Sequence, residues 1–196
     1  MSNVVVVLDA CVLYPASLRD TLLRAASAGL YRVQLTDEIL EEVQRNLFKK
    51  GMKEAKAERL IRAIKEHFSD AFVAQHRLII TSMTNHVKDR HVLAAAVVSR
   101  AQVIVTQNLR DFPDASLTPF EIEAQSPDDF LVHLYYLDRE AMAKIVVEQA
   151  TDLCNPSKTT PELLHTLAQH APNFVSILQE EFDFGAYSAD LKKGAS

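Results

Sequence analysis

The sequence predicts an α/β protein with a central parallel sheet and helices on both faces. An uninterrupted apolar run at residues 4–8 and a second segment with an apolar centre at residues 102–106 are typical of strands buried on both faces of a parallel sheet. Segments with helical spacing stand between these runs, and such alternation implies parallel strands joined by helices. The composition, 48% hydrophobic and 24% charged with only four glycines among 196 residues, suits a globular protein rich in helix.

The first elements follow one another closely. Residues 4–8 form the first predicted strand, which ends at Asp9. A helix is expected over residues 16–29, where apolar side chains recur at helical spacing, and a short second strand over residues 33–35. Thr36 is the expected N-cap of the next helix, because its hydroxyl can accept a bond from a free backbone N–H.

The helical pattern is expected to continue with few interruptions to about residue 74, as two successive helices. Residues 78–81 are a candidate strand, residues 91–100 an alanine-rich helix, and residues 102–106 the last strand of the series. Ligands bind outside the carboxyl ends of the strands in such sheets. Polar residues at those ends are therefore the candidates for function.

A polar stretch over residues 121–129 predicts a domain boundary. We expect a domain of residues 1–125 and a helical extension of residues 126–196, with amphipathic helices over residues 130–153 and 161–181. Residues 1–111 carry 16 basic and 12 acidic side chains, a net charge of +4, whereas the rest carry 5 and 14, a net charge of −9. The acidity of the whole chain therefore belongs to the extension, which is expected to aid solubility or, alternatively, to dock near the basic helices.

The cysteines and the hydropathy predict a cytoplasmic protein without a membrane segment. Cys11 and Cys154 are far apart and show no spacing typical of a disulfide framework or a thiolate metal site. No apolar run approaches the roughly 18 residues that a membrane span requires. A reducing cytoplasm fits both observations.

Four acidic residues lie at strand ends or near helix starts on one predicted rim of the sheet. Each alone has an ordinary explanation, because an aspartate at a helix start is usually a cap and a glutamate beside another is usually solvated. Together they would repel one another in one cleft unless a cation neutralised them. Oxygen ligands without cysteine or clustered histidine indicate Mg2+ or Mn2+ rather than zinc. The four residues are Asp9, Glu42, Asp89 and Asp111.

The sequence around these acids resembles the PIN domain family, with four motifs in the family's order and spacing. The resemblance covers about residues 3–125 and is nearest to the VapC-like toxins of bacterial toxin-antitoxin systems. It implies a PIN-like, Rossmann-like three-layer sandwich with a central parallel sheet. The four motifs are the stretches at residues 8–15, 38–43, 89–96 and 105–113.

The resemblance implies a metal-dependent endoribonuclease that hydrolyses RNA phosphodiester bonds. It also implies a cognate antitoxin protein that holds the enzyme inactive, and a homodimer. Asn108 stands where many members carry an acid, which lowers the charge of the site and bears on the number of metals bound. By the resemblance, the metal-binding and catalytic residues are Asp9, Glu42, Asp89 and Asp111, and the supporting residues are Thr106 and Asn108.

Basic residues follow the predicted helix that carries Glu42. They recur at steps of three or four, which predicts one basic helical face. Such a face is usually only solvated, but its position beside the acids favours phosphate binding. Arg90 and Arg110 are each adjacent to one of the four acids, and each could bind phosphate or pair with a carboxylate. His91 is expected to be a structural residue at a helix start. The candidate RNA-binding residues are Arg45, Lys49, Lys53, Lys56, Arg90 and Arg110.

Two other functions have to be weighed against the nuclease. A non-catalytic PIN-like module would bind RNA or a protein partner; Asn108 favours it and the four acids oppose it. A phosphatase of the haloacid dehalogenase type also places Asp after its first strand. That class needs a second Asp two residues later, where this chain has Cys11.

Overall fold

The computed structural model describes residues 4–153 and 159–182, so Cys154 lies outside the described part of the chain. The chain forms two compact units. The first contains residues 1–19 and 31–126, and the second contains residues 20–30 and 127–196.

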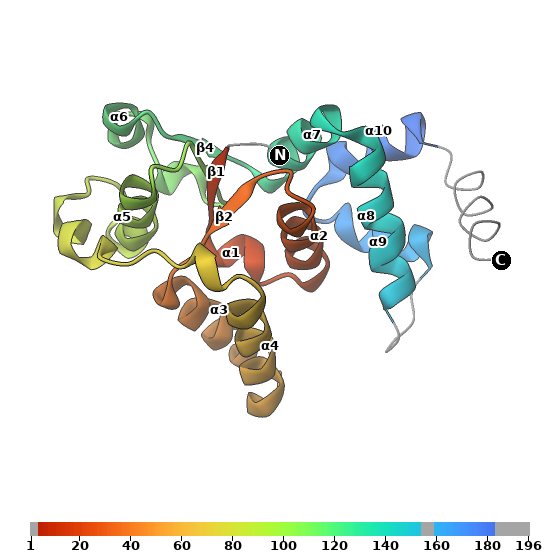
Figure 1. The fold of residues 1–196 in the computed structure, drawn as a ribbon, viewed down its shortest axis with the longest axis horizontal. Helices are drawn as coiled ribbons and strands as arrows, with labels where there is room; N and C mark the ends of the chain where they lie inside the picture. Colours follow the sequence, from red (N-terminus) through yellow and green to blue (C-terminus); the bar gives the residue numbers. More distant parts are fainter. Residues whose placement is uncertain (1–3, 154–158, 183–196) are drawn as a thin grey trace. The chain divides into compact units, whose positions relative to one another are not determined.

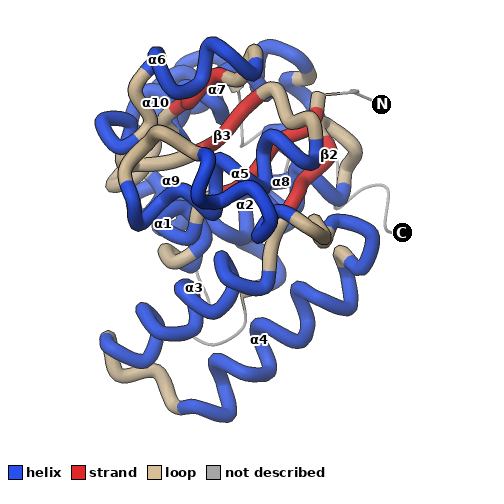
Figure 2. Tube along the Cα trace, turned by 90° about the vertical axis from the view of Figure 1, so that its left-hand side faces the viewer, coloured by secondary structure: helices blue, strands red, loops and turns tan. Residues whose placement is uncertain are grey.

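A four-stranded parallel sheet forms the centre of the first unit (Figures 1 and 2). This confirms the predicted α/β class. The strand order is β2-β1-β3-β4, so the chain leaves β1 for β2 on one side and later returns to β3 on the other. The strands are β1 (Val5–Leu8), β2 (Arg32–Gln34), β3 (Val103–Val105) and β4 (Glu123–Gln125).

Strand β4 was not predicted. Its three residues are polar or small and are only partly buried, so they lack the apolar run that indicates a strand. They are a strand because they pair with β3 at the edge of the sheet, with Val103 opposite Glu123. The segment that the sequence marks as a boundary therefore belongs partly to the sheet.

The register between β1 and β3 positions the site. Leu8 lies opposite Val105, so Asp9 and Thr106 are the first residues beyond two neighbouring strands. The backbone N–H of Asp9 donates to the carbonyl oxygen of Val105 at 3.1 Å. This is the point where the strand order reverses, which is where α/β sheets place their ligands.

Helices cover both faces of the sheet in the first unit. Helix α5 contacts β1, β2 and β3, and α1 lies on the other side of β1 (Figure 1). Thr36 caps α3 as predicted, since its Oγ1 accepts from the backbone N–H of Ile39 at 3.1 Å. The helices that begin in this unit are α1 (Ala10–Leu13), α2 (Ala16–Ser27), α3 (Asp37–Lys49), α4 (Glu54–His67), α5 (Arg90–Ser99) and α6 (Asp114–Leu117).

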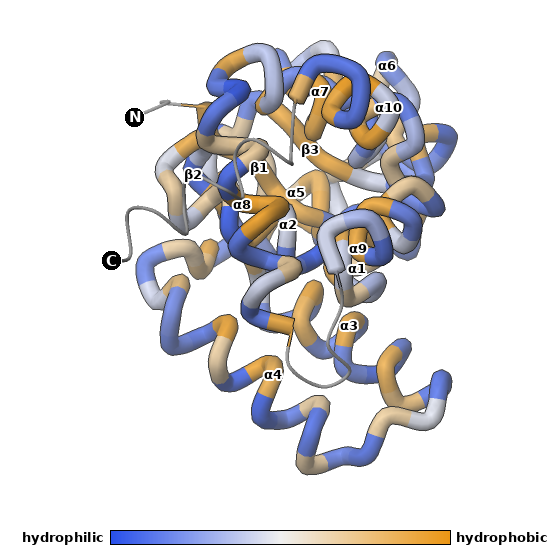
Figure 3. The backbone as a smooth tube through the Cα atoms, turned by 90° about the vertical axis from the view of Figure 1, so that its right-hand side faces the viewer, coloured by the Kyte–Doolittle hydropathy of each residue, from blue (hydrophilic) through white to orange (hydrophobic). Residues whose placement is uncertain are grey.

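The two helices expected before about residue 74 are α3 and α4, and the second ends at His67, earlier than expected. Helix α3 ends at Lys49, and Gly51 adopts a φ of 84°, a left-handed conformation that glycine tolerates best. The chain reverses there, and α4 packs against α3 (Figure 2). Hydrophilic and hydrophobic residues alternate along α4 (Figure 3), and the reversal lets its apolar side chains be buried.

The candidate strand at residues 78–81 is also wrong. This segment belongs to a 3-10 helix, η2 (His76–Ser82), in which Leu78 is 78% exposed. The start of η2 is fixed to α3 because Glu38 pairs with both His76 and Arg77. The apolar residues 78–81 therefore belong to a 3-10 helix whose start is fixed by ion pairs, and they do not join the sheet.

The second unit is helical. The predicted helix over residues 130–153 is interrupted at Asp138, whose carboxylate caps α8 by accepting from the N–H of Ala141 at 2.9 Å. Asp128 accepts from the backbone N–H groups of Asn173 and Phe174, at 3.1 and 2.9 Å. No helix in the described residues has the length and apolarity needed to cross a membrane. The helices are α7 (Pro127–Leu137), α8 (Arg139–Asp152), α9 (Thr160–Leu167) and α10 (Pro172–Glu181).

Candidate active site

Asp9 is fixed at the carboxyl end of β1 and is only 2% exposed. The hydroxyl of Thr106 donates to its Oδ2 at 2.7 Å, and the thiol of Cys11 donates to the same oxygen at 3.0 Å. Among the described residues, no protein donor reaches Oδ1 of Asp9. One carboxylate oxygen is therefore held by the protein while the other can bind a ligand.

Cys11 serves Asp9 as a neutral donor. Burial, with the charge of Asp9 beside it, raises the pKa of the thiol to about 12. The backbone N–H of Gln107 donates to its sulfur at 3.2 Å. The thiol therefore stays protonated near neutral pH and is not an activated nucleophile.

Glu42 projects from the second turn of α3 and lies within electrostatic reach of two other predicted acids. Burial raises its pKa, the charges of His91 and Arg45 oppose the shift, and the charges of Asp9 and Asp89 add to it. The Nη2 of Arg45 is 3.4 Å from Oε1 of Glu42. The Nε2 of His91 is 4.0 Å from the same oxygen.

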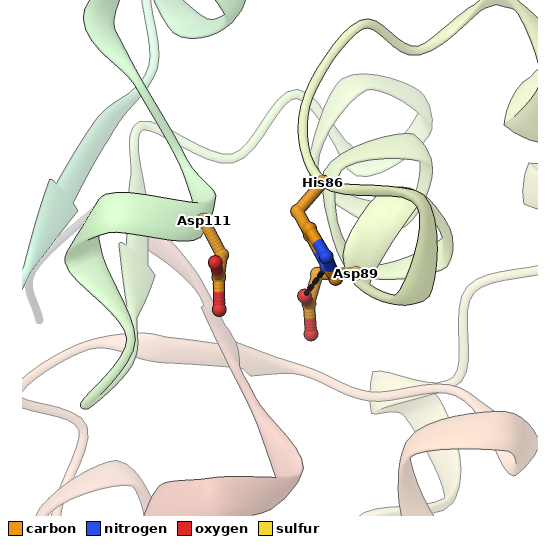
Figure 4. Close-up of side chains that lie close together, drawn as sticks. All are labelled: His86, Asp89 and Asp111. Atoms are coloured by element: carbon orange, nitrogen blue, oxygen red, sulfur yellow. Dashed lines mark hydrogen bonds and ion pairs between the residues drawn. The ribbon is translucent and has the colours of Figure 1, made fainter.

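Asp89 and Asp111 come together with His86, a residue that sequence reasoning missed. The ligand atoms of the three residues lie within 4.8 Å of one another (Figure 4). Burial raises the pKa of Asp89, the hydrogen bond of His86 opposes this, and the charges of Asp9 and Asp111 add to it. The available signal was the position of His86 three residues before Asp89, which brings both side chains together in one tight turn.

The acids of this site have few basic partners. In residues 4–153 and 159–182, no lysine or arginine makes an ion pair with Asp9, Asp89 or Asp111. Two buried groups at or next to the site also lack a hydrogen-bond partner in that part of the chain, namely both polar atoms of the Asn85 side chain and Nε2 of His91. Crowded carboxylates with raised pKa values and few cationic partners are the surroundings in which a divalent cation binds.

Comparisons with known proteins agree with this geometry. The PIN domain family matches residues 5–110, which is more than half of the chain. The chain belongs to the PIN domain family. The match spans Asp9, Glu42, Asp89 and Asn108 and ends one residue before Asp111.

The resemblance to VapC-like proteins is confirmed as well. Residues 127–180 match the VapC50 C-terminal domain, so the extension has a counterpart in that group. VapC50 of Mycobacterium tuberculosis strain H37Rv, whose name gives ribonuclease as its expected activity, is 41% identical over 116 residues. The match covers 59% of this chain and 69% of that protein. No solved structure matches the chain.

Asn108 lies in the loop that joins β3 to Asp111 of this PIN domain. Its backbone N–H donates to Oγ1 of Thr106 at 3.0 Å, and its carbonyl oxygen accepts from the N–H of Asp111 at 2.8 Å. The predicted supporting residue Thr106 thus contacts both Asp9 and this loop. The half-buried side chain of Asn108 makes no hydrogen bond within the described part of the chain.

The single basic face predicted for the helix after Glu42 is wrong, because the turn at Gly51 divides the candidate residues between two helices. Arg90 is half-buried and its Nε donates to the carbonyl oxygen of Asn85 at 3.3 Å. Arg110 is exposed beside Asp111. The other exposed candidates are Arg45 and Lys49 on α3 and Lys53 and Lys56 at the start of α4.

His91 makes both a helix-start contact and a contact toward the site. Its Nδ1 lies 3.0 Å from the carbonyl oxygen of Lys88, which is consistent with the expected structural role. Its other ring nitrogen is buried beside Glu42. The ring therefore lies between the start of α5 and the acids.

Proposed function

We propose that this PIN domain protein is a metal-dependent endoribonuclease and the toxin of a toxin-antitoxin pair. The observation that carries the proposal is the meeting of Asp9, Asp89 and Asp111 near the carboxyl ends of the strands, with no lysine or arginine paired to them among the described residues and with Glu42 completing the group. The relationship to VapC50 supports ribonuclease activity rather than another hydrolysis.

The four acids would hold Mg2+ or Mn2+. When bound, the cation lowers the pKa of a water and offsets charge on the scissile phosphate. Thr106 and Cys11 fix Oδ2 of Asp9, which directs its other oxygen toward the ligand. The backbone of Asn108 sets the turn that presents Asp111.

Glu42 is the carboxylate best suited to accept a proton from the attacking water. In the metal-free protein its pKa is raised, because burial and the charges of Asp9 and Asp89 outweigh the opposing charges of His91 and Arg45. A half-buried carboxylate beside the metal-binding acids is placed to take up such a proton. His91 Nε2, 4.0 Å from Oε1, lies close enough to steady the side chain. No serine or histidine nucleophile is required by this chemistry.

RNA would approach across basic groups at the edge of the site. Arg45 stands one turn after Glu42, and Arg110 precedes Asp111. Both are exposed, so they can reach phosphates while the acids bind the cation. Lys49, Lys53 and Lys56 would extend the contact toward the α3–α4 turn.

We further propose that residues 1–125 form the nuclease domain and residues 126–196 the helical extension, in a cytoplasmic protein that is inhibited by an antitoxin and forms a homodimer. The resemblance to VapC-like toxins supports these assignments. The match of residues 127–180 to a separate C-terminal domain supports the boundary.

Cleavage of labelled single-stranded RNA tests the function. Wild-type protein is compared with Asp9→Asn and with Asp114→Asn, which removes an exposed acid of α6 as a control. We expect cleavage by wild type and the control with Mn2+ or Mg2+, none in chelator, and none by Asp9→Asn. Equal cleavage by Asp9→Asn would contradict the proposed site.

A non-catalytic RNA- or protein-binding module is the second candidate, and the observation that favours it is Asn108 in place of an acid. The same assay separates the two functions if the protein is first unfolded and refolded to remove a bound inhibitor. RNA binding without cleavage by refolded wild type, in the presence of Mn2+, would establish the module and exclude the nuclease.

A further inference from the structure

His86 is positioned by the backbone of the two acids that it faces. Its N–H donates to the carbonyl oxygen of Asp111 at 3.1 Å, and its own carbonyl oxygen accepts from the N–H of Asp89 at 2.9 Å. Two main-chain bonds therefore tie His86 directly to both acids. A site whose supports are already fixed loses little entropy when a ligand binds.

The three side chains converge. Nδ1 of His86 lies 3.1 Å from Oδ2 of Asp89, and Asp111 faces the pair from the loop after β3 (Figure 4). One ligand atom from each residue lies within 4.8 Å of the others. Ligands at about 2.1 Å from one cation are roughly 3 to 4 Å apart, so small side-chain rotations would bring all three to the same ion.

A second observation next to His86 is a buried amide without a hydrogen-bond partner among the described residues. Asn85 is 3% exposed, and neither polar atom of its side chain has a partner among the described residues. Buried amide groups nearly always have a partner, often an ordered water. Water carried by a cation at the adjacent His86 would supply one.

The ligand types determine which cation is favoured. Mg2+ takes oxygen ligands and retains much of its water, whereas imidazole nitrogen is a ligand for first-row transition metals. One nitrogen added to two carboxylates therefore raises affinity for a transition cation more than for Mg2+. The sequence prediction of oxygen ligands alone did not include this nitrogen.

We propose that His86 is a third protein ligand on the Asp89–Asp111 side of the site, and that its imidazole makes this site prefer Mn2+ and similar transition cations over Mg2+. The inference rests on the proposed function only in that both need a divalent cation near Asp89. The alternative is that His86 forms only a surface ion pair with Asp89, which would leave metal selectivity unaffected.

Pulsed electron paramagnetic resonance of bound Mn2+ tests the ligand directly. We expect wild type to show coupling from a directly bound nitrogen, and His86→Ala to lose it. Titration calorimetry should show that His86→Ala weakens Mn2+ binding at least about 10-fold and Mg2+ binding much less. His67→Ala, which removes an exposed imidazole at the end of α4, should behave like wild type in both measurements.

Unchanged nitrogen coupling and unchanged Mn2+ affinity in His86→Ala would overturn the inference. Coupling that survives in His86→Ala but disappears in His91→Phe would overturn it too, by assigning the nitrogen to His91. RNA cleavage measured on the same samples keeps the two proposals apart. If wild-type protein binds Mn2+ through a nitrogen but does not cleave RNA, the proposed nuclease function is contradicted and His86 remains a metal ligand. If RNA is cleaved but His86→Ala has the metal selectivity of wild type, the nuclease function stands and His86 is not a ligand.

Discussion

The hydroxyl of Thr106 donates a 2.7 Å hydrogen bond to Oδ2 of Asp9, joining the first residues beyond β1 and β3. The same hydroxyl oxygen accepts from the N–H of Asn108 at 3.0 Å. One buried side chain therefore fixes the orientation of the first acid and the path of the loop that leads to Asp111. We therefore expect loss of the Thr106 hydroxyl to reduce RNA cleavage more than it reduces the stability of the fold.

Thr106→Val keeps the shape of the side chain and removes both bonds. We expect RNA cleavage to fall about 10- to 100-fold, because the groups that orient metal ligands commonly contribute this much. The free energy of unfolding should fall by about 1.5–3 kcal/mol, as for loss of a hydrogen bond to a charged group. Thr118→Val, which removes a bond to a backbone carbonyl of α6, is the control. Full cleavage by Thr106→Val would show that Asp9 needs no such support.

Asp89→Asn should stabilise the protein in the absence of metal. The raised pKa of Asp89 means that the folded state holds the proton more tightly than the unfolded state. Stability is therefore lost as pH rises from the unfolded value of about 3.9 through the folded pKa, and the charged carboxylate remains a cost at pH 7. Asparagine removes that cost, so we expect the Tm of Asp89→Asn in chelator to exceed that of wild type by a few degrees at most, on the scale of roughly 2–4 °C per kcal/mol for a protein of this size.

Thermal unfolding in chelator at pH 7 and again near pH 4 measures this effect. The difference between Asp89→Asn and wild type should narrow at the lower pH, where a larger fraction of the wild-type carboxyl is protonated. Saturating Mn2+ should reverse the order, because the wild-type protein gains more binding energy. A Tm of Asp89→Asn below that of wild type, in chelator at pH 7, would contradict the claim that the charged Asp89 carboxylate destabilises the metal-free protein.

Asn108→Asp tests whether this position limits metal binding. The side chain makes no hydrogen bond within the described residues, so the exchange adds a charge without breaking a contact. We expect tighter cation binding or a second bound cation in calorimetric titrations, since ligand charge raises the affinity for hard cations. Asn46→Asp on α3 adds the same charge away from the site loop and is the control. The same stoichiometry and affinity in Asn108→Asp and wild type would mean that this residue does not contact the metals.

Lys49→Gln combined with Lys53→Gln tests the proposed RNA surface at the α3–α4 turn. Each phosphate contact to single-stranded nucleic acid contributes about 0.7 to the slope of log K against log salt. We expect the double variant, made in an Asp9→Asn background, to reduce the slope by about 1.4. Lys144→Gln, in the second unit, should leave the slope unchanged. An unaltered slope in the double variant would show that Lys49 and Lys53 do not contact RNA phosphates.

Local sequence was enough to determine β1, the Thr36 cap and the α/β class. Each depends on residues close together in the chain, namely an apolar run, one hydroxyl and an alternation of periodic segments. Asp9, Glu42 and Asp89 could be chosen for the same reason, since strand ends and helix starts can be located from nearby residues. The apolar residues at 78–81 wrongly predicted a strand, because the ion pairs of Glu38 hold the start of this segment as the 3-10 helix η2.

Tertiary structure decided the features that depend on residues distant in sequence. Strand β4 exists because β3 offers its edge to polar residues that would not form a strand alone. The reversal at Gly51 divides the basic residues because α4 buries its apolar side chains only by turning back. His86 joins the site because its backbone bonds to Asp111, a residue of a different loop. The sequence by itself therefore located the acids and the Thr106 hydroxyl that we propose as a cation site, and only the folded chain decided that the imidazole of His86 and the thiol of Cys11 stand beside them.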